Sequence, residues 1–211
     1  MRLFVAIDIQ DDIRERIGLF LEGVRGFAPD AKWVSPESFH ITLKFIGEKS
    51  PEDAERIKQV LRAIKAAPVT VSFRSYGFFP TLSKARVFWT GIEGGERLTQ
   101  LASAVDEATL TVGIPREKAP FTPHLTLARA RDGSPRGASG RPHAHPGDRP
   151  RSTFARVQEK LQALPSPEFG TMTATEFFLY ESKLSPKGAH YTKLERFALG
   201  KAAAPNSHNN E

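Results

Sequence analysis

Two segments of the chain alternate apolar and polar residues and carry a histidine and a threonine at matching places. They read FHITLKFIGE, residues 39–48, and TPHLTLARA, residues 122–130. Successive side chains of a strand point to opposite faces of the sheet. The first segment therefore predicts an apolar core face and a polar face, formed by Phe39, Ile41, Leu43 and Phe45 and by His40, Thr42 and Lys44. The second segment predicts Leu125 and Leu127 on the core face and His124, Thr126 and Ala128 on the other.

The rest of the hydrophobic pattern mixes helical and strand periodicity. Apolar residues at three- and four-residue spacings predict a helix over 11–24. Ser50, followed by Pro51 and two carboxylates, marks the start of a helix that runs to about residue 66. Further helices are predicted over 96–110 and 152–164, and strands over 3–7, 32–34, 39–46, 69–79, 86–93, 124–130, 172–181 and 190–199.

The two His-x-Thr-Leu segments fit an internal duplication of the chain. From His40 to His124 is 84 positions (124 − 40), and the same offset relates Arg2-Leu3-Phe4-Val5 to Arg86-Val87-Phe88-Trp89. We therefore expect two pseudo-symmetric lobes, with both His-Thr pairs facing a central cleft. Residues 1–200 are expected to form this one domain, with a mobile basic insertion at about 131–150 and a disordered tail at 201–211.

Composition narrows the classes of protein. The 211 residues with 39% hydrophobic content suit one globular unit, and the absence of cysteine excludes disulfides and thiolate metal sites. No stretch approaches the roughly 20 apolar residues of a membrane span, and the N-terminus lacks a secretory pattern, so we expect a cytoplasmic protein. The net charge of +6 mildly favours phosphate-bearing partners, nucleic acid above all.

Two histidines opposed across a cleft suit acid–base chemistry at a phosphate. Imidazole has an unperturbed pKa near 6.5, so one ring can accept a proton while the other donates one. The hydroxyls of Thr42 and Thr126 can hydrogen-bond to non-bridging phosphate oxygens. Lys44, or an arginine near Arg129, could offset the phosphate charge.

Other interpretations of these residues are possible. A single His-x-Thr motif in a strand usually marks only a solvent-exposed polar face. The presence of a second copy at a matching place is what favours a catalytic site. Two histidines without a nearby carboxylate provide too few ligands for a zinc site. His143 and His145 could add ligands, but they lie in the predicted insertion. We therefore expect no metal and no cofactor. We place His190 on a strand surface, and Phe4, Phe78 and Trp89 in the core.

At these motifs the sequence resembles the two-histidine phosphoesterase superfamily, and within it the RNA 2′,3′-cyclic phosphodiesterase, or 2′-5′ RNA ligase, family. The opening RLFVAIDI and the two motif strands resemble that family's strands. The closing run LYESKLSPKGAHYTKLERFAL resembles the family's C-terminal signature. Five residues of this run match positions of that signature: Tyr180, Ser182, Gly188, Tyr191 and Leu194.

The resemblance implies an α+β fold of two lobes, each with an antiparallel sheet flanked by helices. It also implies hydrolysis of RNA 2′,3′-cyclic phosphate ends to a 2′-phosphomonoester without metal, with reversible 2′-5′ RNA ligation. By the same resemblance His40 is the proton donor and His124 the proton acceptor, although the duplication leaves the two equivalent by sequence. We expect a monomer whose partner is RNA with a 2′,3′-cyclic phosphate terminus. The alternatives are a non-catalytic RNA-end binding module and a phosphodiesterase of small cyclic nucleotides.

The resemblance also places Arg129 at the phosphate, as a substrate-binding residue with Thr42 and Thr126. Strict alternation from His124 would turn Arg129 toward the core instead. A bend or bulge after Leu127 would bring its side chain to the histidine face.

Overall fold

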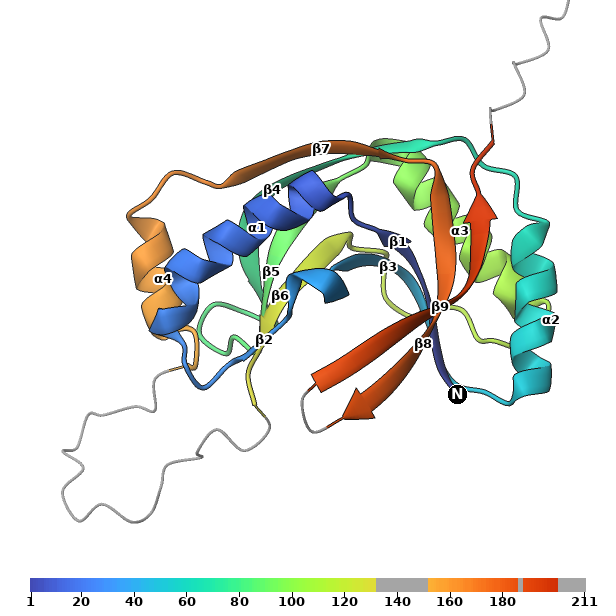
Figure 1. The fold of residues 1–211 in the computed structure, drawn as a ribbon, viewed down its shortest axis with the longest axis horizontal. Helices are drawn as coiled ribbons and strands as arrows, with labels where there is room; N and C mark the ends of the chain where they lie inside the picture. The colour runs from blue at the N-terminus through green and yellow to red at the C-terminus, as the bar shows by residue number, and fades with distance from the viewer. Residues whose placement is uncertain (132–151, 186–187, 201–211) are drawn as a thin grey trace, which may run out of the picture.

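A computed structural model describes residues 1–131, 152–185 and 188–200 of the chain (Figure 1). The strands are β1 Arg2–Asp8, β2 Lys32–Trp33, β3 His40–Glu48, β4 Val69–Phe79, β5 Val87–Glu93, β6 His124–Arg129, β7 Glu168–Ala174, β8 Glu176–Ser185 and β9 Gly188–Ala198. The helices are α1 Asp11–Val24, α2 Pro51–Arg62, α3 Gly95–Leu110 and α4 Ala155–Gln162, with 3-10 turns at Arg25–Phe27 and Pro36–Ser38. The predicted insertion after Arg131, with His143 and His145, and the predicted tail at 201–211 lie outside the described residues.

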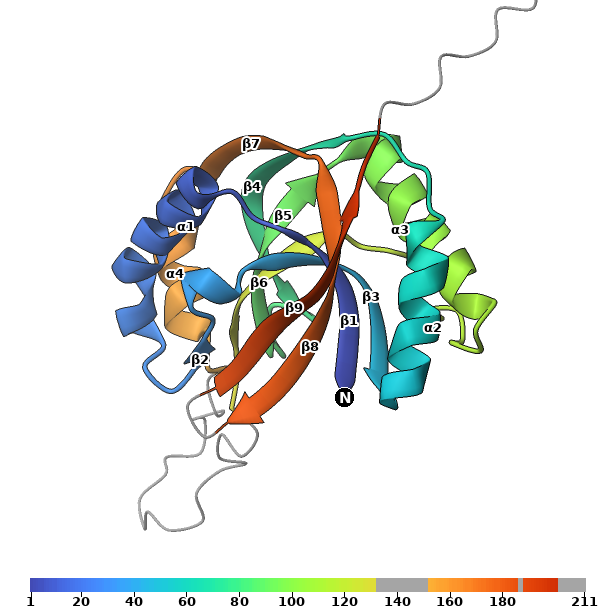
Figure 2. The same cartoon turned by 45° about the vertical axis from the view of Figure 1, so that its right-hand side comes forward.

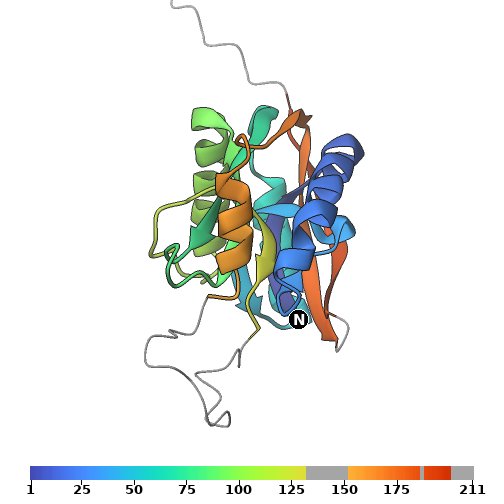
Figure 3. The same cartoon turned by 90° about the vertical axis from the view of Figure 1, so that its left-hand side faces the viewer.

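The strands form two antiparallel sheets, which confirms the predicted α+β class. One sheet has the order β3-β1-β8-β9 and the other β2-β6-β5-β4-β7. The sheets approach each other along β3 and β6, the two motif strands. In Figure 2 the helices lie in two pairs at the sides of the sheets, α1 with α4 and α2 with α3. Figure 3 shows the side occupied by α1 and α4. One continuous apolar core joins residues of both sheets and all four of these helices.

Local sequence signals set several of these boundaries. The Ser50 side chain accepts a hydrogen bond from the backbone N–H of Asp53 at 3.1 Å, which confirms the predicted start of α2. The helix ends at Arg62, earlier than the predicted residue 66. The predicted strand 172–181 is in fact parts of two strands, because β7 ends at Ala174 in one sheet and β8 begins at Glu176 in the other. No glycine or proline marks this crossing in the sequence.

A β-bulge in β3 corrects the predicted faces of that strand. In the β1–β3 ladder Val5 lies opposite Lys44 and Ala6 opposite Thr42, so Leu43 is an extra residue without a partner. Lys44 therefore turns into the core, where it is 2% exposed, and Phe45 turns outward with 58% of its surface exposed. The prediction that Phe45 is a core residue and that Lys44 faces the phosphate is wrong at both positions.

The ammonium group of the buried Lys44 is hydrogen-bonded to two acceptors inside the protein. Its ammonium group donates to the carboxylate of Asp106 on α3 and to the carbonyl oxygen of Pro115 at 2.9 Å. Burial raises the pKa of Asp106, but the hydrogen bond from Lys44 and the charges of Lys44 and Arg116 outweigh it, so the pKa is lowered. This ion pair compensates the charge buried at the bulge and ties β3 to α3.

Candidate active site

Both His-Thr pairs lie on the faces of β3 and β6 that point away from the apolar core. His40, Thr42, His124 and Thr126 are half-buried, whereas the intervening Ile41, Leu43, Leu125 and Leu127 are buried. The two strands are neighbours in space, and the charges of His124 and Arg129 act on His40. The structure thus brings the two predicted pairs together.

The two imidazoles are held in the same way. The Nδ1 atom of His40 lies 2.8 Å from the carbonyl oxygen of Ser38, and Nδ1 of His124 lies 2.8 Å from that of Thr122. A carbonyl oxygen can only accept a hydrogen bond, so Nδ1 carries the proton in each ring. The Nε2 atom is therefore left in both rings to accept or donate a proton.

His40 sits among aromatic rings. Its ring centroid lies 4.8 Å from that of Phe4 and 5.0 Å from that of Tyr191, with Tyr180 at 6.3 Å. Burial lowers the pKa of His40, and the charges of Arg129 and His124 lower it further, while the Ser38 carbonyl and Asp8 act in the opposite direction. Burial also raises the pKa of Tyr180 and of Tyr191, which keeps both hydroxyls neutral near pH 7.

Asp8 is a neighbour of His40 that the sequence did not single out. It lies directly opposite His40 in the β1–β3 ladder. Its carboxylate accepts hydrogen bonds from the Ile9 backbone at 2.8 Å and from Arg14 at 2.7 Å, and it pairs with Lys193. Burial raises the pKa of Asp8, but these partners outweigh burial and hold its pKa below the ordinary value.

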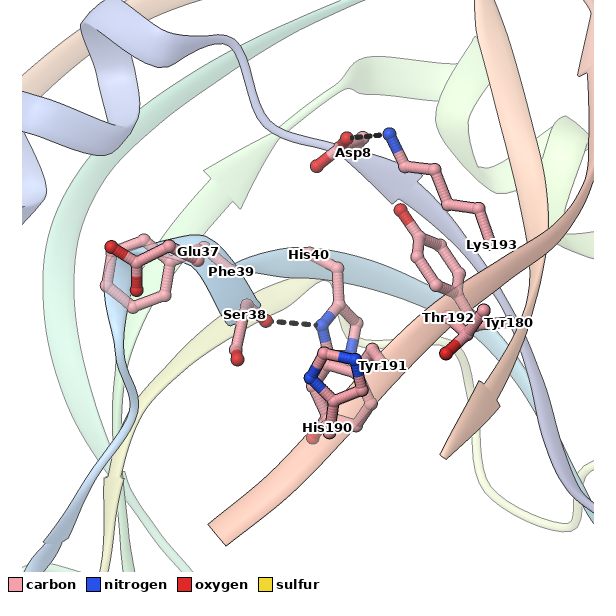
Figure 4. A pocket seen from close by; sticks show the side chains of 10 residues that line it. All are labelled: Asp8, Glu37, Ser38, Phe39, His40, Tyr180, His190, Tyr191, Thr192 and Lys193. Carbon is pink, nitrogen blue, oxygen red and sulfur yellow. Dashed lines mark hydrogen bonds and ion pairs between the residues drawn. The ribbon is translucent and has the colours of Figure 1, made fainter. Parts of the chain in front are cut away.

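A pocket of about 390 Å³ opens beside His40 (Figure 4). Tyr191 of β9 packs against the His40 ring, and His190, Asp8 and Lys193 also line the pocket. His190 is exposed on its strand, as predicted. The pocket is lined by polar and aromatic side chains around His40.

His124 has its own aromatic neighbours. The centroid of its ring lies 5.2 Å from that of Phe79 and 6.3 Å from that of Trp89. The Phe79 and Trp89 rings stack on each other with their centroids 5.0 Å apart. The Trp89 ring lies flat over Gly77, where a Cβ atom would be 2.1 Å from Cζ2 of the indole. Phe4 and Phe78 are buried as predicted, whereas Trp89 is half-buried on the histidine face.

A second β-bulge brings Arg129 to the histidine face. Phe88 lies opposite Ala128 and Trp89 opposite Thr126, so Leu127 is the extra residue. Ala128 is buried, and Arg129 is exposed with its Nη2 atom 3.4 Å from the Thr126 hydroxyl oxygen. The bulge after Leu127 thus removes the conflict between alternation and the resemblance.

Within residues 1–131, 152–185 and 188–200 no three histidine or carboxylate side chains gather in a way that could hold a metal ion. The candidate ligands His143 and His145 lie outside those ranges. No helix in the described part of the chain is long and apolar enough to cross a membrane.

Comparison with known proteins shows the family to which the chain belongs. Residues 11–181 match the model of the 2′-5′ RNA ligase superfamily. The RNA 2′,3′-cyclic phosphodiesterase of Archaeoglobus fulgidus is 34% identical over 197 residues, which cover 93% of this chain and 99% of that protein. The enzyme of the same name from Methanothermobacter thermautotrophicus is 30% identical over 201 residues, covering 94% of this chain and 99% of that one. Among solved structures, E. coli LigT complexed with 3′-AMP matches with a TM-score of 0.72 at 27% identity, covering 95% of this chain and 98% of LigT.

Proposed function

Since the chain belongs to the 2′-5′ RNA ligase superfamily, we propose that it hydrolyses RNA 2′,3′-cyclic phosphate ends to 2′-phosphomonoesters. The names of the Archaeoglobus and Methanothermobacter relatives support this activity. The observation that carries it is the matched pair of imidazoles, each with Nδ1 bonded to a backbone carbonyl and with Nε2 as the ring nitrogen available for proton transfer. Such a pair can supply one general base and one general acid to a phosphate held between them.

In the proposed reaction His124 is the base and His40 the acid. Nε2 of His124 accepts a proton from water as the water oxygen attacks phosphorus. The bond between phosphorus and the 3′ oxygen breaks, and Nε2–H of His40 protonates that oxygen. The products are a 2′-phosphomonoester and a 3′-hydroxyl, and proton exchange with solvent restores both rings. With the 5′-hydroxyl of a second RNA in place of water, the same steps give a 2′-5′ linkage, and their reverse cleaves it.

The acid role of His40 requires that the substrate change its protonation. Burial and the charges of Arg129 and His124 favour neutral His40 in the free protein. A bound phosphate anion offsets the positive charge of Arg129 and attracts a proton to the nearby imidazole. We therefore infer that protonation of His40 is coupled to the arrival of the phosphate.

In this proposal the hydroxyls of Thr42 and Thr126 donate hydrogen bonds to the two non-bridging oxygens of the phosphate. Arg129, beside Thr126, supplies the compensating charge with a planar, two-pronged donor. Lys44 has no part in this site, because its ammonium group is held by Asp106 and Pro115.

A direct test uses an RNA oligonucleotide that ends in a 2′,3′-cyclic phosphate, incubated with the protein and a chelator. The expected product is the 2′-monophosphate end. Chelator-sensitive turnover would contradict the metal-free mechanism. Salt-sensitive RNA binding without any product would favour a binding module instead. Faster turnover of a mononucleoside cyclic phosphate than of RNA would favour a phosphodiesterase of small nucleotides.

A further inference from the structure

We propose that Lys32 is a second phosphate-binding residue, which holds the phosphodiester next to the cyclic phosphate at the RNA end. This proposal rests on the proposed function and names a part of the substrate that a mononucleotide lacks. Lys32 lies in β2, the edge strand beside β6, and is not part of either His-x-Thr motif.

Strand pairing places Lys32 on the same face as the catalytic groups. In the β2–β6 ladder Lys32 lies directly opposite Arg129, and Trp33 lies opposite the buried Ala128. Residues directly opposite each other in an antiparallel pair point to the same side of the sheet. Arg129 points to the face of His124 and Thr126, so Lys32 points there too.

The core side of β2 is fixed independently by Trp33. Its indole Nε1 donates to the carbonyl oxygen of Ala28 at 3.0 Å, and its ring packs edge-on against Phe88 at 6.1 Å. The backbone N–H of Val34 donates to Leu127 at 2.9 Å, which continues the pairing past the bulge. With Trp33 turned to the core, alternation leaves Lys32 on the opposite face.

The two cations lie opposite each other without an ion-pair partner among the described residues. Lys32 and Arg129 are both exposed. The ion pairs formed within residues 1–131, 152–185 and 188–200 include neither of them. Like charges directly opposite each other destabilise a sheet. A site that concentrates positive charge at a cost in stability fits an anionic ligand.

The order of the strands separates the roles of the two cations. Arg129 is on the same strand as His124 and contacts Thr126, so we assign it to binding the reacting phosphate. Lys32 is one strand farther from His124, at the edge of the sheet, where a polymer can leave the site. The phosphodiester on the 5′ side of the terminal nucleotide is the next anion along the RNA. A lysine ammonium suits it, because it binds as a point charge without demanding one orientation.

The test compares two substrates in the full-length protein. One is a dinucleotide that ends in a 2′,3′-cyclic phosphate, and the other is the corresponding mononucleoside 2′,3′-cyclic phosphate. Lys32→Ala is expected to lower kcat/KM for the dinucleotide about 10-fold through KM, the scale of a hydrogen bond to a charged group. The salt slope of oligonucleotide binding should fall by about 1, and turnover of the mononucleotide should change less than about 2-fold.

Three comparisons make the result decisive. Lys32→Arg should retain most dinucleotide activity, because the charge is kept. Lys65→Ala is the matched control, since this exposed lysine comes shortly after α2 in the chain, and α2 and β2 lie on opposite sides of the molecule (Figure 1). This variant should change the turnover of neither substrate. Thermal unfolding of Lys32→Ala should occur at the wild-type temperature or slightly above it, since a like-charge contact is removed.

The possible outcomes separate this proposal from the proposed function. If the wild-type protein turns over neither substrate, the phosphodiesterase assignment fails. If it turns over both and Lys32→Ala slows both equally, Lys32 acts on the reacting phosphate and the second phosphate site is wrong. An unchanged dinucleotide KM in a folded Lys32→Ala protein also overturns it.

Discussion

The strands β3 and β6 carry the same motif and the same bulge, yet they surround it with different chemistry. In each strand the extra residue is a leucine, Leu43 or Leu127, and these are 84 positions apart (127 − 43). The next residue turns inward and the one after it turns to the histidine face. Those residues are Lys44 and Phe45 in β3 and Ala128 and Arg129 in β6.

The difference between the strands shows what the bulge contributes and what the side chains contribute. The bulge delivers the fifth residue after the histidine to the active face in both lobes. In β6 that residue is a cation, whereas in β3 it is a phenylalanine with 58% of its surface exposed. An exposed aromatic ring can stack on a nucleobase. The residue that follows the bulge is thus suited to an anion in β6 and to an apolar group in β3.

Removing either histidine tests the similarity of the two lobes and should have the largest effect. His40→Ala and His124→Ala are each expected to lower kcat about 10²-fold or more, because each ring transfers one of the two protons. Turnover of a cyclic-phosphate RNA measures this, with circular dichroism as the check of folding. Near-wild-type activity in either variant would remove that residue from the mechanism.

Exchanging the residues that follow the bulges tests the difference between the lobes. Arg129→Met should lower kcat/KM about 10- to 100-fold, since a charge-assisted contact to the phosphate is lost. Adding Phe45→Arg to that variant should restore part of the loss, because residue 45 lies on the same kind of face. The single variant Phe45→Arg is the control. No recovery in the double variant would show that the two positions do not reach one phosphate.

The inward-turned residues provide a prediction about stability. Lys44→Met should lower the free energy of unfolding by about 2 to 4 kcal/mol, because Asp106 loses its buried partner while retaining some exposure. Urea denaturation measures this change. Arg62→Met, which breaks the more exposed pair with Glu195, should lower the free energy of unfolding far less, because solvent screens that pair. If the folded Lys44→Met protein loses kcat instead, Lys44 acts in the site after all.

The smallest expected effect is a shift in the pH profile. A proton donor must be protonated, so activity falls as pH rises through its pKa. Burial lowers the pKa of His40 in the free protein, so the alkaline limb of kcat/KM should begin below about pH 6.5. The limb of kcat should lie at higher pH, since the bound phosphate raises this pKa. His40→Ala should remove the alkaline limb. Loss of the acid limb in His40→Ala instead would make His40 the proton acceptor.

Much of this site could be predicted from the sequence because it depends on one strand at a time. Alternation within each strand predicts that His40 and Thr42 point to one face and Ile41 to the other. It predicts the same for His124 and Thr126 relative to Leu125. The Ser50 cap of α2 and the family resemblance also follow from local sequence. These signals need no knowledge of which strands pair.

Only the tertiary structure decided what lies beyond Leu43 and Leu127. A bulge exists because the partner strand, β1 or β5, has one residue fewer across the same span, and the alternation within a single strand cannot reveal that. The burial of Lys44 depends on Asp106 from a distant helix. Asp8 beside His40 and Lys32 beside Arg129 are likewise products of strand register. The sequence by itself identified the candidate reactive residues, and strand pairing decided which charges lie next to them, because register is a property of two strands together.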